Sequence, residues 1–108
     1  MSKNIEFSVL CDIYGNLLAE KQKTALELYY NEDLSLSEIA EHTGISRQGV
    51  REQIKHAEGQ LAFFESALGL YEKSAKTEKI INRLEQLAAP IGNNEISELI
   101  GKLKSLNE

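Results

Sequence analysis

The first thirty residues carry apolar side chains at the spacing of two amphipathic helices. Between Ile5 and Leu18 the intervals between apolar residues alternate between three and one, which places them on one face of a helix. We expect Gly15 to weaken this helix, and its apolar face to comprise Leu10, Ile13, Tyr14, Leu17 and Leu18. A second helix is predicted from Ala19 or Glu20 to Tyr30, with four side chains directed inward: Ala25, Leu26, Leu28 and Tyr29.

The following segment contains clear signals for the start and the end of a short helix. Ser35 and Glu38 stand at the Ser-x-x-Glu spacing of a capping box, in which each side chain bonds the backbone of the other residue. The helix that starts there is expected to carry Ile39 and Ala40 inward. It is expected to stop at Gly44, because glycine readily adopts the left-handed conformation that follows a helix.

The next helix is predicted to be long and to carry a repeat of apolar residues. Ser46 is its expected N-cap, and Gly69 is expected to end or bend it. Intervals of four and three residues separate the apolar positions Val50, Ile54, Ala57, Leu61, Phe64 and Leu68. This 3.5-residue period keeps one seam facing a partner helix. The seam is therefore either an interface with a second chain or a surface that packs under the C-terminal helices.

Two further amphipathic helices are predicted in the tail. The first has an apolar face of Ile80, Ile81, Leu84, Leu87 and Ala88 and closes at Pro90 and Gly92. The second, capped by Asn93 or Asn94, has the apolar residues Ile96, Leu99, Ile100, Leu103 and Leu106. We expect one compact all-α domain with a front part, residues 1–68, and a helical tail, residues 69–108, that packs on it or on a partner chain. Because so small a chain has apolar surface left to cover, we expect a homodimer with an interface at Leu61, Phe64, Leu68, Ile80, Ile81, Leu84 and Leu87.

Residues 36–54 have the residue pattern of a helix-turn-helix. In this pattern a small residue lets two helices cross closely, a glycine makes the turn, and apolar residues hold the second helix in place. The residues at these structural positions are Ile39, Ala40, Gly44, Ile45, Val50 and Ile54. Such a unit holds the exposed face of its second helix outward. The candidate DNA-contacting residues on that face are Ser46, Arg47, Gln48, Gly49, Arg51 and Lys55. Gly49 either allows close approach of a partner backbone or is an ordinary exposed glycine.

Composition and charge limit the functions that this motif can serve. The net charge is −5, and residues 1–60 hold ten acidic and six basic side chains, so any contact with nucleic acid has to be local. The single cysteine, Cys11, is expected to be a buried small hydrophobe, and His42 and His56 have no metal-ligand spacing. The chain has no glycine-rich phosphate loop and no apolar run long enough for a membrane. We therefore expect a non-enzymatic cytoplasmic protein with no metal and no cofactor.

Several runs of residues resemble known bacterial sequences. The runs 18–30, 34–41 and 44–50 resemble the promoter-reading domain of sigma factors over about half of the chain. The runs 28–40, 45–50 and 68–73 are similar to the YlxM family of small bacterial helix-turn-helix proteins, a resemblance that covers nearly the whole length. Ala19 departs from the sigma-like pattern, which usually places a Ser or Thr helix cap there.

The YlxM resemblance implies an all-helical, dimeric, cytoplasmic protein of Gram-positive-type bacteria that takes part in the signal recognition particle pathway. It also implies that residues 46–55 form the DNA-reading helix. Two functions follow as hypotheses. The first is an accessory or regulatory protein whose partners are the protein or RNA of that particle. The alternative is a transcriptional regulator that binds double-stranded DNA through Arg47, Gln48, Arg51 and Lys55, and a plain scaffold would do neither.

Overall fold

A computed structural model describes residues 3–108, and the expected all-α fold is confirmed. Throughout this range the regular structure is helical and includes no strand. The elements are α1 (Ile5–Tyr14), the short 3₁₀ helix η1 (Gly15–Leu17), α2 (Glu20–Tyr30), α3 (Leu36–Thr43), α4 (Arg47–Leu68), α5 (Leu70–Ala88) and α6 (Asn94–Leu106). Within the described residues, no helix has the combination of length and apolar character that crossing a membrane requires.

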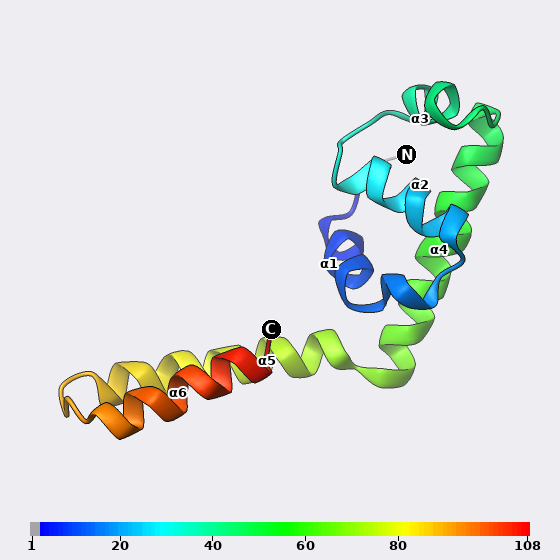
Figure 1. Ribbon diagram of the computed structural model, residues 1–108. Helices are drawn as coiled ribbons and strands as arrows, with labels where there is room; N and C mark the ends of the chain where they lie inside the picture. Colours follow the sequence, from blue (N-terminus) through cyan, green and yellow to red (C-terminus); the bar gives the residue numbers. More distant parts are fainter. Residues whose placement is uncertain (1–2) are drawn as a thin grey trace. The chain divides into compact units, whose positions relative to one another are not determined.

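The chain divides into two compact units at Gly69. The front unit comprises α1 to α4, and the tail unit, Leu70–Glu108, comprises α5 and α6. In the front unit, α1, α2 and α3 all pack against α4, which is the longest helix of the protein (Figure 1). The four residues of α4 that face this core have no exposed surface: Val50, Ile54, Ala57 and Leu61. The N-terminal part of the heptad seam is therefore the core of its own unit.

The seam changes character towards its C-terminal end. Phe64 is half-buried, and its ring packs against the ring of Tyr14 with a centroid distance of 5.9 Å. Leu68 is exposed at the end of α4. The expectation that Leu61 faces a second chain conflicts with this packing, because helices of the same chain cover Leu61 completely. The corresponding expectation for the half-buried Phe64 stays a prediction.

The first helix is shorter than its apolar spacing suggests. The α-helix ends at Tyr14, and Gly15 starts a 3₁₀ turn with three residues per turn, which carries Leu17 away from the apolar face. Leu17 is consequently exposed, whereas Leu10, Tyr14 and Leu18 are buried as expected. Ile13 lies within α1 and is also partly exposed, at 37%. Cys11 is also buried as expected, and burial raises the pKa of its thiol. The prediction of one uninterrupted apolar face from Leu10 to Leu18 is therefore wrong at Ile13 and Leu17.

Two tyrosine hydroxyls tie the first helices to α4. The hydroxyl of Tyr14 donates a hydrogen bond of 2.7 Å to Glu65, and the hydroxyl of Tyr30 donates to Glu58. Burial and the neighbouring Glu58 carboxylate raise the pKa of Tyr30, so this hydroxyl keeps its proton and remains a donor. These bonds fix the direction of α4 relative to α1 and α2.

The predicted caps of α3 and α4 are confirmed. Ser35 and Glu38 form the complete capping box. The hydrogen bond from the backbone N–H of Ser35 is the main cause that holds the pKa of Glu38 below its usual range, and the Ser35 side chain is the second. Gly44 and Gly69 adopt the left-handed conformation after α3 and α4, with φ of 76° and 61°. Local sequence signals therefore define both ends of the two helices that make the helix-turn-helix.

The start of α2 lacks a side-chain cap, as the departure at Ala19 suggests. Ala19 is exposed and has the extended φ and ψ of an N-cap residue, but its methyl group accepts no hydrogen bond. We expect Ala19→Ser to raise the free energy of unfolding by about 1 kcal/mol, because the hydroxyl would accept a bond from the first turn. Chemical denaturation measures the change. The control Ala62→Ser, at an exposed position inside α4, should instead be slightly destabilising, and equal effects of the two changes would contradict the capping argument.

The tail unit is a helical hairpin. α5 and α6 run antiparallel and are joined by a short turn in which Gly92 has a positive φ and Asn93 caps α6 (Figure 1). Lys104 pairs with Glu85 at 2.6 Å, and the side chain of Asn107 donates to the carbonyl of Ser74. Among the tail's apolar side chains, those buried are Ile81 and Ile100. The hairpin therefore has a small core.

Candidate macromolecule-binding face of the helix-turn-helix

The turn between α3 and α4 is built by three consecutive residues. The backbone N–H of Gly44 donates to the carbonyl of Ala40 at 2.9 Å and closes α3. Ile45 follows and is half-buried beneath the turn. Ser46 then caps α4, since its hydroxyl oxygen accepts a bond of 3.0 Å from the N–H of Gly49.

The predicted structural positions lie where a helix-turn-helix requires them. Ile39, Val50 and Ile54 have no exposed surface. Ala40 and Ile45 are half-buried, so each contributes less to the core than the sequence pattern suggests. Together these side chains hold α3 across the N-terminal part of α4 and leave the opposite side of α4 exposed.

The candidate contact residues share the first three turns of α4. Arg47, Gln48 and Lys55 are exposed, and Arg51 is half-exposed. Gln48 donates a bond of 3.4 Å to Glu52, one turn further along the helix. The Ser46 oxygen is already used for the cap, so this residue supports the turn whatever else it contacts. Which of these side chains bind a partner stays a prediction.

The structure explains why position 49 is a glycine, which the sequence alone did not reveal. A Cβ atom at this position would lie 2.8 Å from Cγ2 of Ile45 and 3.1 Å from the hydroxyl oxygen of Ser46. Contacts this short require the turn to shift, because both atoms belong to short side chains held in place by the core and by the cap. Gly49 therefore serves the fold of the turn, which neither of the two sequence interpretations had included.

The first turn of α4 differs in charge from the first turns of the other helices. α1, α2, α3, α5 and α6 each have an acidic residue in the first turn, whereas α4 has none there and starts with Arg47. The free N–H groups of a helix start attract anions. However, Arg47 shares a shallow pocket with the acidic residues Asp33 and Glu38. The face is therefore close to neutral overall.

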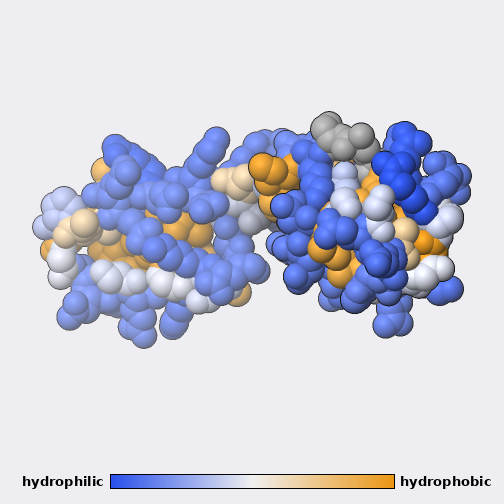
Figure 2. Space-filling view, turned by 90° about the horizontal axis from the view of Figure 1, so that it is seen from above, coloured by the Kyte–Doolittle hydropathy of each residue, from blue (hydrophilic) through white to orange (hydrophobic). Residues whose placement is uncertain are grey.

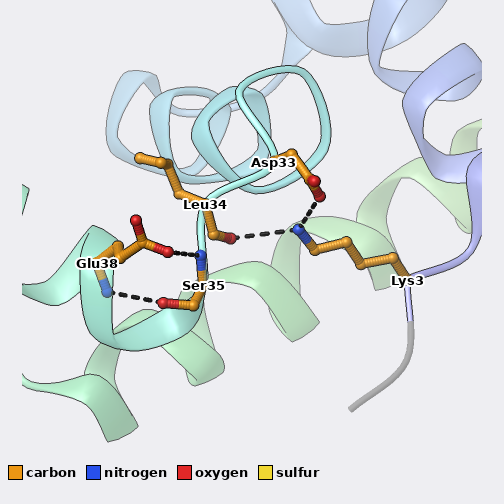
Figure 3. Close-up of polar contacts among 5 residues, drawn as sticks. All are labelled: Lys3, Asp33, Leu34, Ser35 and Glu38. Atoms are coloured by element: carbon orange, nitrogen blue, oxygen red, sulfur yellow. Dashed lines mark hydrogen bonds and ion pairs between the residues drawn. The ribbon is translucent and has the colours of Figure 1, made fainter.

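Lys3 supports the loop that leads into α3, a contact that sequence analysis did not predict. Its ammonium group lies 2.7 Å from Asp33 and 3.3 Å from the carbonyl of Leu34 (Figure 3). The same ammonium group lies 4.4 Å from the centroid of the Tyr29 ring. Asp33 has a φ of 54°, in the left-handed region. The hydrogen bond and charge of Lys3 hold the pKa of Asp33 below its usual range. Lys3 thus helps to fix the backbone just before the helix-turn-helix.

Among residues 3–108, no group of three or more His, Cys, Asp or Glu side chains is arranged to hold a metal ion. His42 and His56 are both exposed, on α3 and α4 respectively.

Comparison with known proteins identifies relatives over almost the entire length. Residues 1–101 match the family model described as "UPF0122: Putative helix-turn-helix protein, YlxM / p13 like". A UPF0122 protein of Clostridium botulinum is 43% identical over 108 residues, which cover 99% of each chain. The UPF0122 protein YlxM of Bacillus subtilis is 36% identical over 108 residues, which cover 100% of this chain and 96% of the relative.

Proposed function

Because the chain belongs to the YlxM / p13-like family of helix-turn-helix proteins, we propose that it is a non-enzymatic accessory or regulatory protein of the signal recognition particle pathway. The resemblance described from the sequence implies this pathway and a cytoplasmic location. The observation that supports an accessory role is the exposed polar face at the start of α4, which the helix-turn-helix holds outward with little net charge. Such a face suits recognition by hydrogen bonds and shape rather than by bulk charge.

The charge of the front unit weighs against general nucleic-acid binding. Residues 1–69 carry eleven acidic and six basic side chains, so the unit as a whole repels a phosphate backbone. A face with three basic side chains makes few phosphate contacts, and binding to DNA is expected to be weak and to fall steeply as salt rises. The same argument favours the protein component of the particle over its RNA as the direct partner.

A second candidate is a DNA-binding transcriptional regulator. The absence of an acidic residue from the first turn of α4, together with the exposed Arg47 and Lys55, favours it. In this function Gln48 and Arg51 read base edges in the major groove, and the helix start contacts a phosphate. The two functions predict losses of binding of different size when the basic side chains of α4 are removed.

Fluorescence anisotropy distinguishes the two functions. The labelled full-length protein is titrated with duplex genomic DNA fragments and, separately, with the RNA and the protein of the signal recognition particle, each at a low and a physiological salt concentration. We expect saturable binding to a particle component at both salt concentrations and DNA binding only at low salt. We also expect Arg51→Ala to reduce binding to the particle component by less than about threefold, as for a charge at the rim of an interface.

A different outcome would favour the regulator. DNA binding that survives physiological salt and is reduced about tenfold or more by Arg47→Ala or Arg51→Ala would overturn the accessory role. Lys21→Ala provides the matched control, because it removes one exposed positive charge from α2 without altering α4. If Lys21→Ala weakened DNA binding as much as Arg51→Ala, the effect would be one of net charge and not of the helix-turn-helix.

A further inference from the structure

Two cations and two carboxylates line one shallow pocket of the front unit, at the loop that leads into α3. The pocket has a volume of about 340 Å³, and its charged side chains are Lys3, Asp33, Glu38 and Arg47. An ion pair joins two of the four, since the ammonium group of Lys3 lies 2.7 Å from Asp33. Within residues 3–108, the guanidinium of Arg47 forms no ion pair with either carboxylate. Arg47 thus borders both carboxylates and pairs with neither.

Lys3 holds Asp33 through contacts that also fix its own position. Its ammonium group donates to the carbonyl of Leu34 at 3.3 Å and lies 4.4 Å from the centroid of the Tyr29 ring. The side chain of Lys3 is consequently 31% exposed, whereas that of Asp33 is 88% exposed (Figure 3). A carboxylate with this exposure is open to a second cation from the solvent side.

Glu38 is less able than Asp33 to accept a new partner. One of its carboxylate oxygens accepts a bond of 3.1 Å from the backbone N–H of Ser35, which completes the capping box of α3. Rotation of this side chain toward Arg47 would break the box and remove a bond from the start of α3. Asp33 is therefore the carboxylate with which Arg47 would pair if Lys3 released it.

Short-range contacts decide which cation neutralises a carboxylate at this surface. Figure 2 shows mostly hydrophilic side chains on the front unit, at the right of that view, with apolar ones in patches between them. Water and salt screen exposed charges beyond roughly 10 Å, so the cation in direct contact with Asp33 dominates. An arginine suits an exposed carboxylate well, because its planar guanidinium can donate two parallel bonds. Removal of Lys3 would consequently let Arg47 pair with Asp33.

We propose that Lys3 is a positioning residue for the candidate binding face: it occupies Asp33 and so leaves Arg47 available to a partner. When Lys3 is neutralised or displaced, Arg47 turns toward Asp33, and the first turn of α4 presents one cation fewer. The exchange of ion pairs is a property of the front unit alone. Its effect on binding rests on the proposed function, in which the exposed face of α4 contacts the partner.

Carbon-13 NMR titration of the Asp33 carboxyl group tests the exchange without any partner. In the unmodified chain the hydrogen bond and the charge of Lys3 hold the pKa of Asp33 below its usual range, and Arg47→Met is expected to leave it there. Lys3→Met keeps the apolar stem of the side chain. In this variant we expect the pKa to stay below its usual range, because Arg47 takes over the carboxylate. The double change Lys3→Met/Arg47→Met should return the pKa to its usual range.

Two results of this titration would overturn the proposal. If Lys3→Met alone raised the pKa of Asp33 as far as the double change does, Arg47 would not reach the carboxylate. If Arg47→Met alone raised it and Lys3→Met did not, Arg47 would already be the partner of Asp33 in the unmodified chain. Lys3 and Arg47 are both exposed, so the helical circular dichroism signal should be retained in every variant.

Fluorescence anisotropy with duplex DNA at low salt then measures the availability of Arg47. Arg47→Met should weaken this binding about threefold, as for the loss of one phosphate contact. Lys3→Met should weaken it by a similar factor, although Lys3 precedes α1. Asp33→Asn removes the carboxylate and suits the left-handed φ of 54° at this position. Its combination with Lys3→Met should therefore restore the binding.

The matched control is Lys3→Met combined with Glu32→Gln. It has the same net charge as Lys3→Met/Asp33→Asn and changes an exposed neighbour, but it leaves Asp33 for Arg47 to pair with. We expect no recovery of binding in this control. Equal recovery in the two double variants, or no loss of binding in Lys3→Met, would overturn the positioning role. The NMR titration involves no partner, so failure of the exchange is distinguishable from failure of the proposed function.

Discussion

Replacement of Leu61 by alanine is expected to lower the free energy of unfolding of the front unit by about 3 kcal/mol. Leu61 has no exposed surface and lies on the face of α4 against which α1 and α2 pack. Truncation removes its transfer free energy and leaves a cavity that a helix held by the bonds of Tyr14 and Tyr30 cannot easily close. Chemical denaturation followed by circular dichroism measures this change.

The comparison with Leu68 makes this prediction specific. Leu68 belongs to the same heptad pattern but is exposed at the end of α4, so Leu68→Ala is expected to cost less than about 1 kcal/mol. If Leu61 instead faced a second chain, its truncation would change the association of the protein and leave the stability of the separate chain nearly unchanged. A similar small loss for both variants would contradict the assignment of Leu61 to the core.

The second large effect is expected at Gly49, where alanine should destabilise the front unit by about 2 kcal/mol. The added methyl group would come within 2.8 Å of Ile45 and would press on the hydroxyl of Ser46 that caps α4. The resulting strain, together with the weakened cap, is expected to exceed the gain of about 1 kcal/mol that alanine has over glycine inside a helix. Thermal and chemical denaturation both report this loss.

Gly59 supplies the internal control for that experiment. It lies further along α4, it is exposed, and no atom is within 4 Å of the position that its Cβ would take. Gly59→Ala should therefore stabilise the protein by about 1 kcal/mol, so the two identical substitutions on one helix are expected to have opposite signs. Stabilisation by both substitutions would mean that the turn accommodates a methyl group at position 49.

Local signals allowed most of the fold to be predicted from the sequence. The capping box at Ser35 and Glu38 and the glycines at 44 and 69 act within a single turn of helix, so the residues that define each boundary are adjacent in the sequence. The apolar period also predicts which face of α4 is apolar. The period does not say which element covers that face. For this reason Leu61 was assigned to an interface, although helices of its own chain bury it.

The parts of the candidate site that were missed depend on contacts between distant residues. Lys3 and Asp33 are thirty residues apart, and neither belongs to a motif. The constraint at Gly49 arises from the conformation of the turn, which brings the side chain of Ile45 over a position four residues later. The polar residues of α4 were placed on an exposed face correctly because helical spacing decides exposure, but spacing does not say which molecule they contact.

The position of Lys3 has a practical consequence for anyone who builds fusion proteins from this chain. Its ammonium group holds the loop before α3 through Asp33 and Leu34, so the amino end of the chain belongs to the same structural unit as the helix-turn-helix (Figure 3). An affinity tag or a fluorescent domain attached there would adjoin the unit whose binding an assay is meant to probe. Attachment at the carboxyl end leaves that loop as it is, and the tag then adjoins a separate unit.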